Sequence, residues 1–251
     1  MASKKIILVT GANSGVGYET SYTLADASPN NHVIMGCRNT TKGAKALEEI
    51  QARKPAGTLS MLEVDISNDD SINAAAQKMA ADFGVLDVLV NNAGIYIEDK
   101  RDRRTDLLET FNTNAAGPVV LTDALLPLLK KSKDPRIINV TSELGSMTKR
   151  ADPNAGGYNL NCDEYRMSKA ALNMASVCMN EWYKSWGAKV WSYCPGWVVS
   201  DLGGRANRQF KIENGADSPE TSAQGILDIV EGKRDGEAGL FVMRWGRRSN
   251  W

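Results

Sequence analysis

Short apolar runs alternate with longer amphipathic stretches along almost the whole chain, and this rhythm restricts the fold more than any other feature of the sequence. Most of the runs are bounded by Gly, Pro, Asn or Asp, which is typical of β-strands. Strands are expected at residues 5–10, 32–38, 59–65, 86–91, 136–142, 189–194 and 240–243. Helices are expected at residues 17–27, 41–53, 68–82, 105–131, 162–186 and 219–231.

The repeated strand–helix order predicts an α/β fold of the Rossmann type, in which a sheet lies between two layers of helices. The expected fold is doubly wound and three-layered, with a central, mostly parallel, seven-stranded sheet. The runs IILVT and VLVNN are apolar nearly throughout, which suits strands that are buried on both faces. A chain of 251 residues is within the size that α/β folds reach without division. We therefore expect a single domain over residues 1–251.

Charge balance, hydropathy and histidine content exclude several classes of function. Thirty Lys and Arg residues balance thirty Asp and Glu residues, so the chain has no net attraction to nucleic acid or to an acidic membrane. No apolar run approaches the ~18 residues of a membrane span, and the run at residues 6–9 is too short for a signal peptide. A single histidine argues against a Ser-His-Asp hydrolase and against a multi-histidine metal site.

The four cysteines are scattered along the chain without a Cys-x-x-Cys pair. Buried free thiols in a reducing compartment are therefore the expected state. Together these features predict a soluble, cytoplasmic protein that uses no metal and binds neither nucleic acid nor membrane.

A glycine-rich turn, TGANSGVG, follows the first expected strand directly and leads into a helix. Glycines permit a tight turn and a close approach of the backbone, and a helix N-terminus offers N–H groups and a positive dipole to a pyrophosphate. An ordinary strand–helix turn has a similar composition, but the position after the first strand favours a dinucleotide site. The candidate residues are Gly11, Asn13, Ser14, Gly15, Val16 and Gly17.

The end of the second strand indicates which dinucleotide is bound. NAD-binding domains tend to place a carboxylate here against the ribose 2′-hydroxyl, but this chain has Arg38 and Asn39. An arginine can pair with a 2′-phosphate, so the sequence favours NADPH/NADP+. The alternative is an arginine that points into water. Asp65, at the end of the third strand, and residues 92–94, after the fourth, are further candidates, although turn chemistry explains them equally well.

Tyr165 and Lys169 are four residues apart on an expected helix, so they share one face. A phenol has a pKa of about 10, and a nearby ammonium should lower it toward useful acid–base catalysis. An amphipathic surface pair is the alternative interpretation. Ser142, at the end of the fifth strand, can donate a hydrogen bond to a substrate carbonyl. Asn114 is a polar residue inside an expected helix, which indicates a local role such as holding water.

Six features occur in a fixed order between residue 5 and about residue 201. They are TGxxxGxG, NNAG, the helix asparagine, the strand-five serine, YxxxK and PGxVxS. The set resembles the short-chain dehydrogenase/reductase family. The chain is similar in particular to NADPH-dependent carbonyl reductases, through CR after strand two and CPGWVVSDLGG after strand six.

The resemblance implies reduction of a small carbonyl substrate by a tetrad of Asn114, Ser142, Tyr165 and Lys169. Tyr165 would protonate the nascent alkoxide, Ser142 would polarise the carbonyl, Lys169 would bind the nicotinamide ribose and tune Tyr165, and Asn114 would position a water. It implies a cofactor site formed by Gly11, Asn13, Ser14, Gly15, Val16, Gly17, Arg38, Asn39, Asp65, Ile66, Asn92, Ala93, Gly94, Tyr165, Lys169, Pro195, Gly196, Val198 and Ser200. An NAD-linked alcohol dehydrogenase and a non-catalytic dinucleotide sensor are the alternatives.

Ser142 and Tyr165 are separated by more residues than in many members of that family. The extra stretch, residues 143–163, is expected to form a substrate-side loop, and with residues 98–104 and 203–218 to shape specificity. The sequence does not identify the substrate. The resemblance also suggests a homodimer or homotetramer, although the extra stretch could obstruct the pairing face. The run 239–251 docks either on the body of the protein or on a neighbour.

Overall fold

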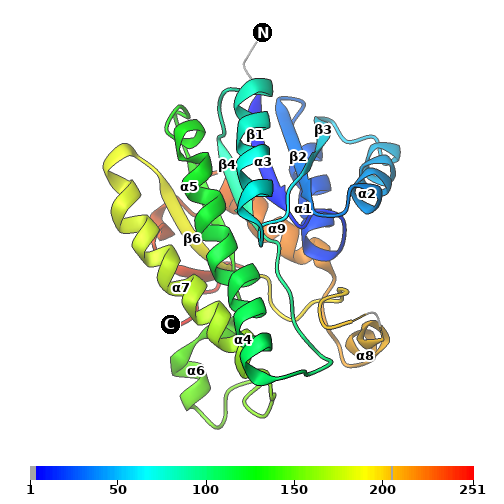
Figure 1. Ribbon diagram of the computed structural model, residues 1–251, viewed down its shortest axis with the longest axis vertical. Helices are drawn as coiled ribbons and strands as arrows, with labels where there is room; N and C mark the ends of the chain where they lie inside the picture. Colours follow the sequence, from blue (N-terminus) through cyan, green and yellow to red (C-terminus); the bar gives the residue numbers. More distant parts are fainter. Residues whose placement is uncertain (1–3, 205) are drawn as a thin grey trace.

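Seven parallel strands form the centre of the computed structural model, which describes residues 4–204 and 206–251 (Figure 1). The strand order is β3-β2-β1-β4-β5-β6-β7, and every adjacent pair is parallel. The strands are β1 (Lys5–Thr10), β2 (Asn31–Cys37), β3 (Thr58–Glu63), β4 (Val88–Asn91), β5 (Arg136–Val140), β6 (Lys189–Cys194) and β7 (Phe241–Met243). The predicted Rossmann-type, doubly wound fold is therefore confirmed, and its sheet is parallel throughout.

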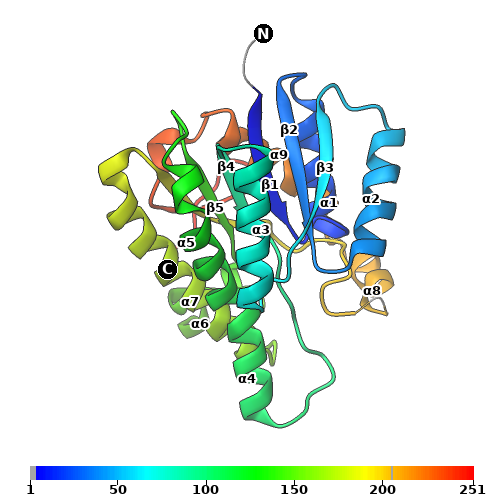
Figure 2. The ribbon, with the colours of Figure 1, turned by 45° about the horizontal axis from the view of Figure 1, so that its top comes forward.

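Helices cover both faces of the sheet (Figures 1 and 2). Those that supply buried residues to one face are α1 (Gly15–Asp26), α2 (Thr40–Ala52) and α9 (Pro219–Val230). Those on the other are α3 (Asp69–Asp82), α5 (Gly117–Leu129) and α7 (Asp163–Tyr183). Along β1, Ile7 and Val9 join the first apolar cluster and Ile6 and Leu8 the second. This alternation explains why the strand sequences are apolar nearly throughout.

The prediction of a single helix at residues 105–131 is wrong, because this part of the chain is divided into separate elements in the structure. Helix α4 (Arg103–Phe111) is followed by a π-helical turn, Asn112–Ala116, and then by α5. The residues before Pro118 are helical, so its missing N–H falls inside a continuous helical stretch, where proline disturbs the regular hydrogen bonding as the sequence led us to expect. π-Turns inside helices are frequent at functional sites, and Asn114 lies within this one.

Two segments that the sequence left as loops contain short helices. A 3₁₀ turn, Glu143–Gly145, and α6 (Met147–Ala151) follow β5, and α8 (Asn207–Glu213) follows β6. Beyond β7, a bridge between Val242 and Arg248 turns the C-terminal residues back onto the body of the protein. Among the described residues, no helix is long and apolar enough to span a membrane.

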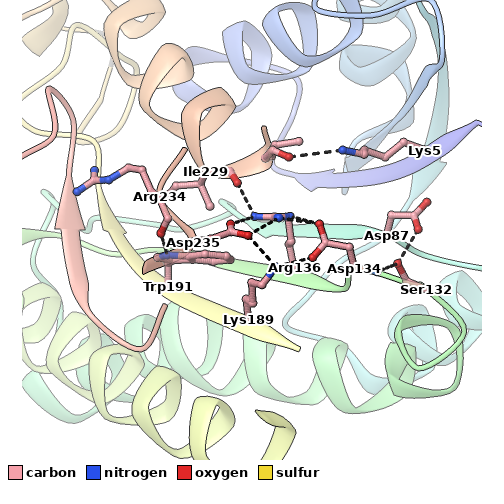
Figure 3. A network of polar contacts seen from close by, with 11 residues as sticks. Lys5, Asp87, Ser132, Asp134, Arg136, Lys189, Trp191, Ile229, Arg234 and Asp235 are labelled. Carbon is pink, nitrogen blue, oxygen red and sulfur yellow. Dashed lines mark hydrogen bonds and ion pairs between the residues drawn. The ribbon is translucent and has the colours of Figure 1, made fainter. Parts of the chain in front are cut away.

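An ion network around a buried arginine lies at the amino ends of β5 and β6 (Figure 3). Arg136, the first residue of β5, is 4% exposed and donates to Asp134, to Asp235 and to the carbonyl oxygen of Ile229. Lys189, the first residue of β6, bonds both carboxylates, at 2.7 and 2.8 Å. The two carboxylates therefore offset the cost of burying the positive charge of Arg136, and removing one carboxylate leaves that charge without one of its partners.

Replacing Asp235 with Asn is expected to lower the free energy of unfolding at pH 7 by about 1–2 kcal/mol after allowance for solvent screening. Hydrogen bonds from Arg136 lower the pKa of Asp235 to about 2. A depressed carboxyl pKa contributes stability above the unfolded pKa, near 3.9, and that contribution is lost as the pH falls toward 2. Denaturant unfolding at pH 7, 5, 3 and 2 measures the difference. Asp228→Asn is the control, because Asp228 pairs with an exposed lysine, Lys233, and not with a buried arginine, and an equal loss there would contradict the prediction.

Candidate active site

A cleft of about 400 Å³ opens at the carboxyl edge of the sheet, where parallel α/β folds bind their ligands. Most of the residues predicted for the site line it: Gly11, Asn13, Ser14, Gly15, Val16, Gly17, Arg38, Asp65, Ile66, Asn92, Ala93, Gly94, Tyr165, Lys169, Pro195 and Ser200. The predicted residues that do not appear in its lining are Asn39, Asn114, Ser142, Gly196 and Val198. The cleft therefore joins segments from both halves of the chain.

The glycine-rich turn has the geometry that a phosphate site requires. Gly11 and Gly15 have φ values of +65° and +56°, and a Cβ atom on Gly11 would lie 2.9 Å from the Cα of Ala93. Helix α1 begins at Gly15, and among the described residues no side chain caps its first turn and none in that turn is acidic. The positive end of the helix dipole therefore faces the cleft, which suits a diphosphate.

Thr10 and Asn92 hold the two turns together. The Asn92 side-chain amide donates to the carbonyl oxygen of Thr10 at 2.8 Å, and the Thr10 hydroxyl accepts the N–H groups of Asn92 and Ala93, both at 3.0 Å. Asn92 thus shapes the cleft by supporting the glycine turn. Sequence reasoning missed the role of Thr10, although a hydroxyl at the last position of a strand before such a turn was the available signal.

Arg38 follows β2 directly, and its exposed side chain lines the cleft. Its Nε is 4.0 Å from the nearer oxygen of Asp65. The other Asp65 oxygen accepts the N–H and the hydroxyl of Ser67, at 3.0 and 2.6 Å. Asn39 does not face the cleft in this way; it caps α2 by accepting the N–H of Lys42 at 2.9 Å. The guanidinium is therefore loosely paired and placed to meet an anion.

Tyr165 and Lys169 are both buried on α7 and both line the cleft. The Lys169 Nζ donates to the carbonyl oxygen of Val140 at 2.9 Å and lies 5.7 Å from the centre of the Tyr165 ring. A Cβ atom on Gly94 would lie 3.5 Å from that Nζ and 3.1 Å from the Oδ1 of Asn114. The absence of a side chain at Gly94 therefore keeps the space beside Lys169 open.

The protonation of this pair differs from the expectation. Burial raises the pKa of Tyr165 well above its usual value, and the hydrogen bond with the Ser142 hydroxyl offsets only part of this. The prediction that the phenol pKa lies below its usual value is wrong, because desolvation of the phenolate outweighs the effects that lower the pKa. Burial also lowers the pKa of Lys169, to about 8. At neutral pH the phenol therefore holds its proton, as a proton donor must.

Ser142 lies two residues beyond the end of β5, where its hydroxyl is near enough to Tyr165 to lower the pKa of the phenol. That hydroxyl also accepts the N–H of Leu144 at 3.2 Å. Ser146, a second hydroxyl in this segment, is buried and caps α6 instead. Ser142 is thus the hydroxyl of the two that reaches the phenol.

Asn114 is fully buried in the π-helical turn. Its amide donates to the carbonyl oxygen of Ile95 at 2.9 Å and to the Ser168 hydroxyl at 3.0 Å, and its Oδ1 accepts the N–H of Ile95 at 2.8 Å. The side chain therefore ties the turn after β4 to helix α7, beside Tyr165. Its predicted role in holding water stays a prediction.

The far end of the cleft is formed by Pro195, Ser200 and residues 201–204. Gly196, with φ of +82°, packs against the guanidinium of Arg244, and Val198 is buried and pairs with Asp217, so both support the turn from behind.

Tyr96 completes the cleft and was missed by sequence reasoning. Its ring lies edge-on to that of Tyr165, with centroids 5.5 Å apart. The signal was an aromatic residue two positions after Gly94, at the end of the NNAG turn. Tyr96 therefore lines the cleft beside Tyr165.

Comparison with known proteins bears on this arrangement. The family model for short chain dehydrogenases matches residues 5–211. The chain belongs to the short-chain dehydrogenase family. The short-chain dehydrogenase/reductase tropE of Talaromyces stipitatus is 32% identical, over 98% of this chain and 97% of that protein. This short-chain dehydrogenase is therefore an oxidoreductase of a family that uses nicotinamide dinucleotides.

Solved structures agree with that assignment. An NADPH-bound carbonyl reductase from chicken fatty liver superposes with a TM-score of 0.84 at 28% identity, over 100% of both chains. The carbonyl reductase Sniffer of Drosophila melanogaster gives 0.80 at 29% identity, also over 100% of both. The similarity to short-chain dehydrogenases thus extends beyond the motifs to the whole fold.

Proposed function

We propose that this short-chain dehydrogenase reduces a ketone or aldehyde carbonyl to an alcohol with NADPH, and that Tyr165 is its general acid. The observation that carries the proposal is the buried Tyr165–Lys169 pair, which shares one cleft with the glycine-rich turn and Arg38. The NADPH-bound carbonyl reductase from chicken fatty liver supports the same reaction. One domain, residues 1–251, would hold both cofactor and substrate.

NADPH, when bound, supplies the hydride. Gly11, Gly15 and the N-terminus of α1 would hold its diphosphate, and the positive φ values and uncapped helix end fit that group. Lys169, whose Nζ lies beside Gly94, would bind the nicotinamide ribose.

The protein's own groups would then handle the carbonyl oxygen. The Ser142 hydroxyl orients and polarises it, and the Tyr165 phenol donates a proton to it as negative charge develops. The Lys169 ammonium stabilises the phenolate that the transfer leaves behind. Asn114 keeps the turn after β4 fixed against α7, so the groups stay aligned.

The assay that tests this function follows NADPH and NADH oxidation with a panel of ketones, aldehydes and quinones. Turnover with NADPH is expected, at a rate that depends on the carbonyl offered. A clear preference for NADH would favour an NAD-linked alcohol dehydrogenase. NADPH binding without turnover of any carbonyl would favour a dinucleotide-sensing protein.

Replacing Arg38 with Asp is expected to lower kcat/KM for NADPH by about 100-fold, because a charge-assisted pair with the 2′-phosphate is lost and a repulsive carboxylate replaces it. The value for NADH should change little or rise, since a carboxylate can accept from the ribose 2′-hydroxyl. The ratio of the two kcat/KM values measures the effect. Lys42→Ala, at an exposed residue of the next helix, is the control. An unchanged ratio in Arg38→Asp would remove the basis for NADPH preference.

A further inference from the structure

The segment that carries Ser142 begins where strand β5 ends, and its first residue is still tied to the sheet, because the N–H of Thr141 donates to the Tyr193 carbonyl oxygen of β6 at 2.8 Å. Strand β5 ends at Val140, and the residues that follow form a 3₁₀ turn and the five-residue helix α6. A helix of this length has no stability of its own in water. The sheet thus holds the segment before Ser142, and the contacts of residues 143–151 hold it after Ser142.

The C-terminal residues hold one side of this segment. The main-chain oxygen of Trp251 accepts both the N–H of Thr148, at 3.0 Å, and its hydroxyl, at 2.6 Å. The Ser249 hydroxyl donates to a carboxylate oxygen of Glu143 at 3.3 Å, and the same carboxylate pairs with Lys149. The tail thus contacts the segment at the residue directly after Ser142 and again at the first turn of α6.

The Trp251 ring anchors the tail to the sheet. It stacks on Phe241 of β7, with centroids 5.4 Å apart and planes 26° apart, and joins a cluster with Cys194 and Met243. The Cys194 sulfur accepts the N–H of Glu143 at 3.3 Å and the N–H of Gly196 at 3.4 Å. The tail, the serine segment and the turn at Pro195 therefore meet around one buried side chain.

We propose that residues Ser249–Trp251 are positioning residues for Ser142, acting through Glu143 and Thr148. The proposal rests on the proposed function, because it assigns Ser142 a role at the substrate carbonyl. The family model ends at residue 211, so it describes no part of this tail. From the opposite side Arg166, next to Tyr165, donates to the carbonyl oxygen of Leu144 at 3.4 Å. The serine segment is thus held between the tail and the catalytic helix.

The test compares Trp251→Ala, Trp251→Phe and a matched control, Trp186→Ala. Trp186 is also partly buried and packs on an aromatic ring, Tyr183, at 5.4 Å, but it lies beyond the C-terminal end of α7. With the best carbonyl of the panel, Trp251→Ala should lower kcat by about 10- to 100-fold, the range that misplacement of a reacting group produces. The dissociation constant for NADPH should stay within about twofold, because no tail residue lines the cleft.

Trp251→Phe should restore most of kcat, because a phenyl ring can still stack on Phe241. Trp186→Ala should lower the melting temperature without lowering kcat. Thr148→Val removes only the hydroxyl contact with Trp251 and should lower kcat about two- to fivefold. This variant tests the proposal even if Trp251→Ala folds poorly. Equal kcat values in Trp251→Ala and Trp186→Ala, or a matching loss of NADPH affinity, would overturn it.

Amide hydrogen exchange gives a readout that needs no turnover. In the wild-type protein the amides of residues 143–149 should exchange slowly, and Trp251→Ala should accelerate them while leaving those of α7 unchanged. Unchanged exchange would overturn the positioning role whatever the activity. If the wild-type protein reduces no carbonyl but exchange responds, the proposed function fails while the tail contact stands.

Discussion

Replacing Tyr165 with Phe is expected to lower kcat for carbonyl reduction by roughly 10²- to 10⁴-fold, the contribution typical of a positioned general acid. The phenyl ring retains the packing of the original, including its edge-on contact with Tyr96. Only the hydroxyl is lost, and burial keeps that hydroxyl protonated at neutral pH by raising its pKa. Steady-state kinetics with NADPH and one carbonyl measure the loss.

The NADPH dissociation constant of Tyr165→Phe should change little, which separates a chemical defect from a binding defect. Tyr96→Phe is the control, because it removes a neighbouring phenol hydroxyl from the same cleft. If Tyr165→Phe kept more than about a tenth of the wild-type kcat, the proton would have to come from another group.

Replacing Lys169 with Met is expected to have opposite effects on activity and stability. Lys169 is 4% exposed, and burial lowers its pKa to about 8. Since the unfolded pKa is about 10.4, the charged form destabilises the folded state fully below pH 8. This cost disappears as the pH rises from about 8 to about 10.4. At pH 7 the Met variant should be more stable by about 1–2 kcal/mol, once the lost bond to Val140 is subtracted.

The same substitution should lower kcat by about 10²-fold or more, because in the proposed reaction the phenolate would lose its positive neighbour and the nicotinamide ribose would lose a ligand. The kcat of the wild-type enzyme should also fall as the pH rises through about 8, where Lys169 loses its charge. Urea unfolding at pH 7 and pH 10.5, with a pH–rate profile, checks both effects. If the Met variant were less stable than the wild type at pH 7, the contacts of the Lys169 ammonium would have to outweigh the cost of burying its charge.

The features that could be predicted from the sequence are those that depend on local spacing. The alternation of apolar runs indicated all seven strands, and every observed strand overlaps its expected range. Tyr165 and Lys169 share a helix face because they are four residues apart, and the glycines of the first turn mark a backbone that other residues rarely adopt. Short-range backbone geometry determines all of these features, so they can be predicted from a single sequence.

Features that depend on tertiary burial could not be predicted in this way. The π-helical turn at residues 112–116 has no periodic signature that distinguishes it from α-helix. The direction of the Tyr165 pKa shift depends on how much protein covers the ring, which spacing alone does not reveal. The contact of Trp251 with Thr148 joins residues that are 103 positions apart. Tyr96 entered the site only because the fold places its ring beside Tyr165.

The ion network around Arg136 lies at the amino ends of β5 and β6, while the cleft lies beyond their carboxyl ends. The groups of the ion network are therefore separate from the groups that line the cleft. Exchanging residues 98–104 or 203–218 for the equivalent loops of a relative leaves every member of the network untouched. This arrangement makes the protein a suitable scaffold for loop grafting, in which new substrate preferences are selected while the frame keeps its resistance to unfolding.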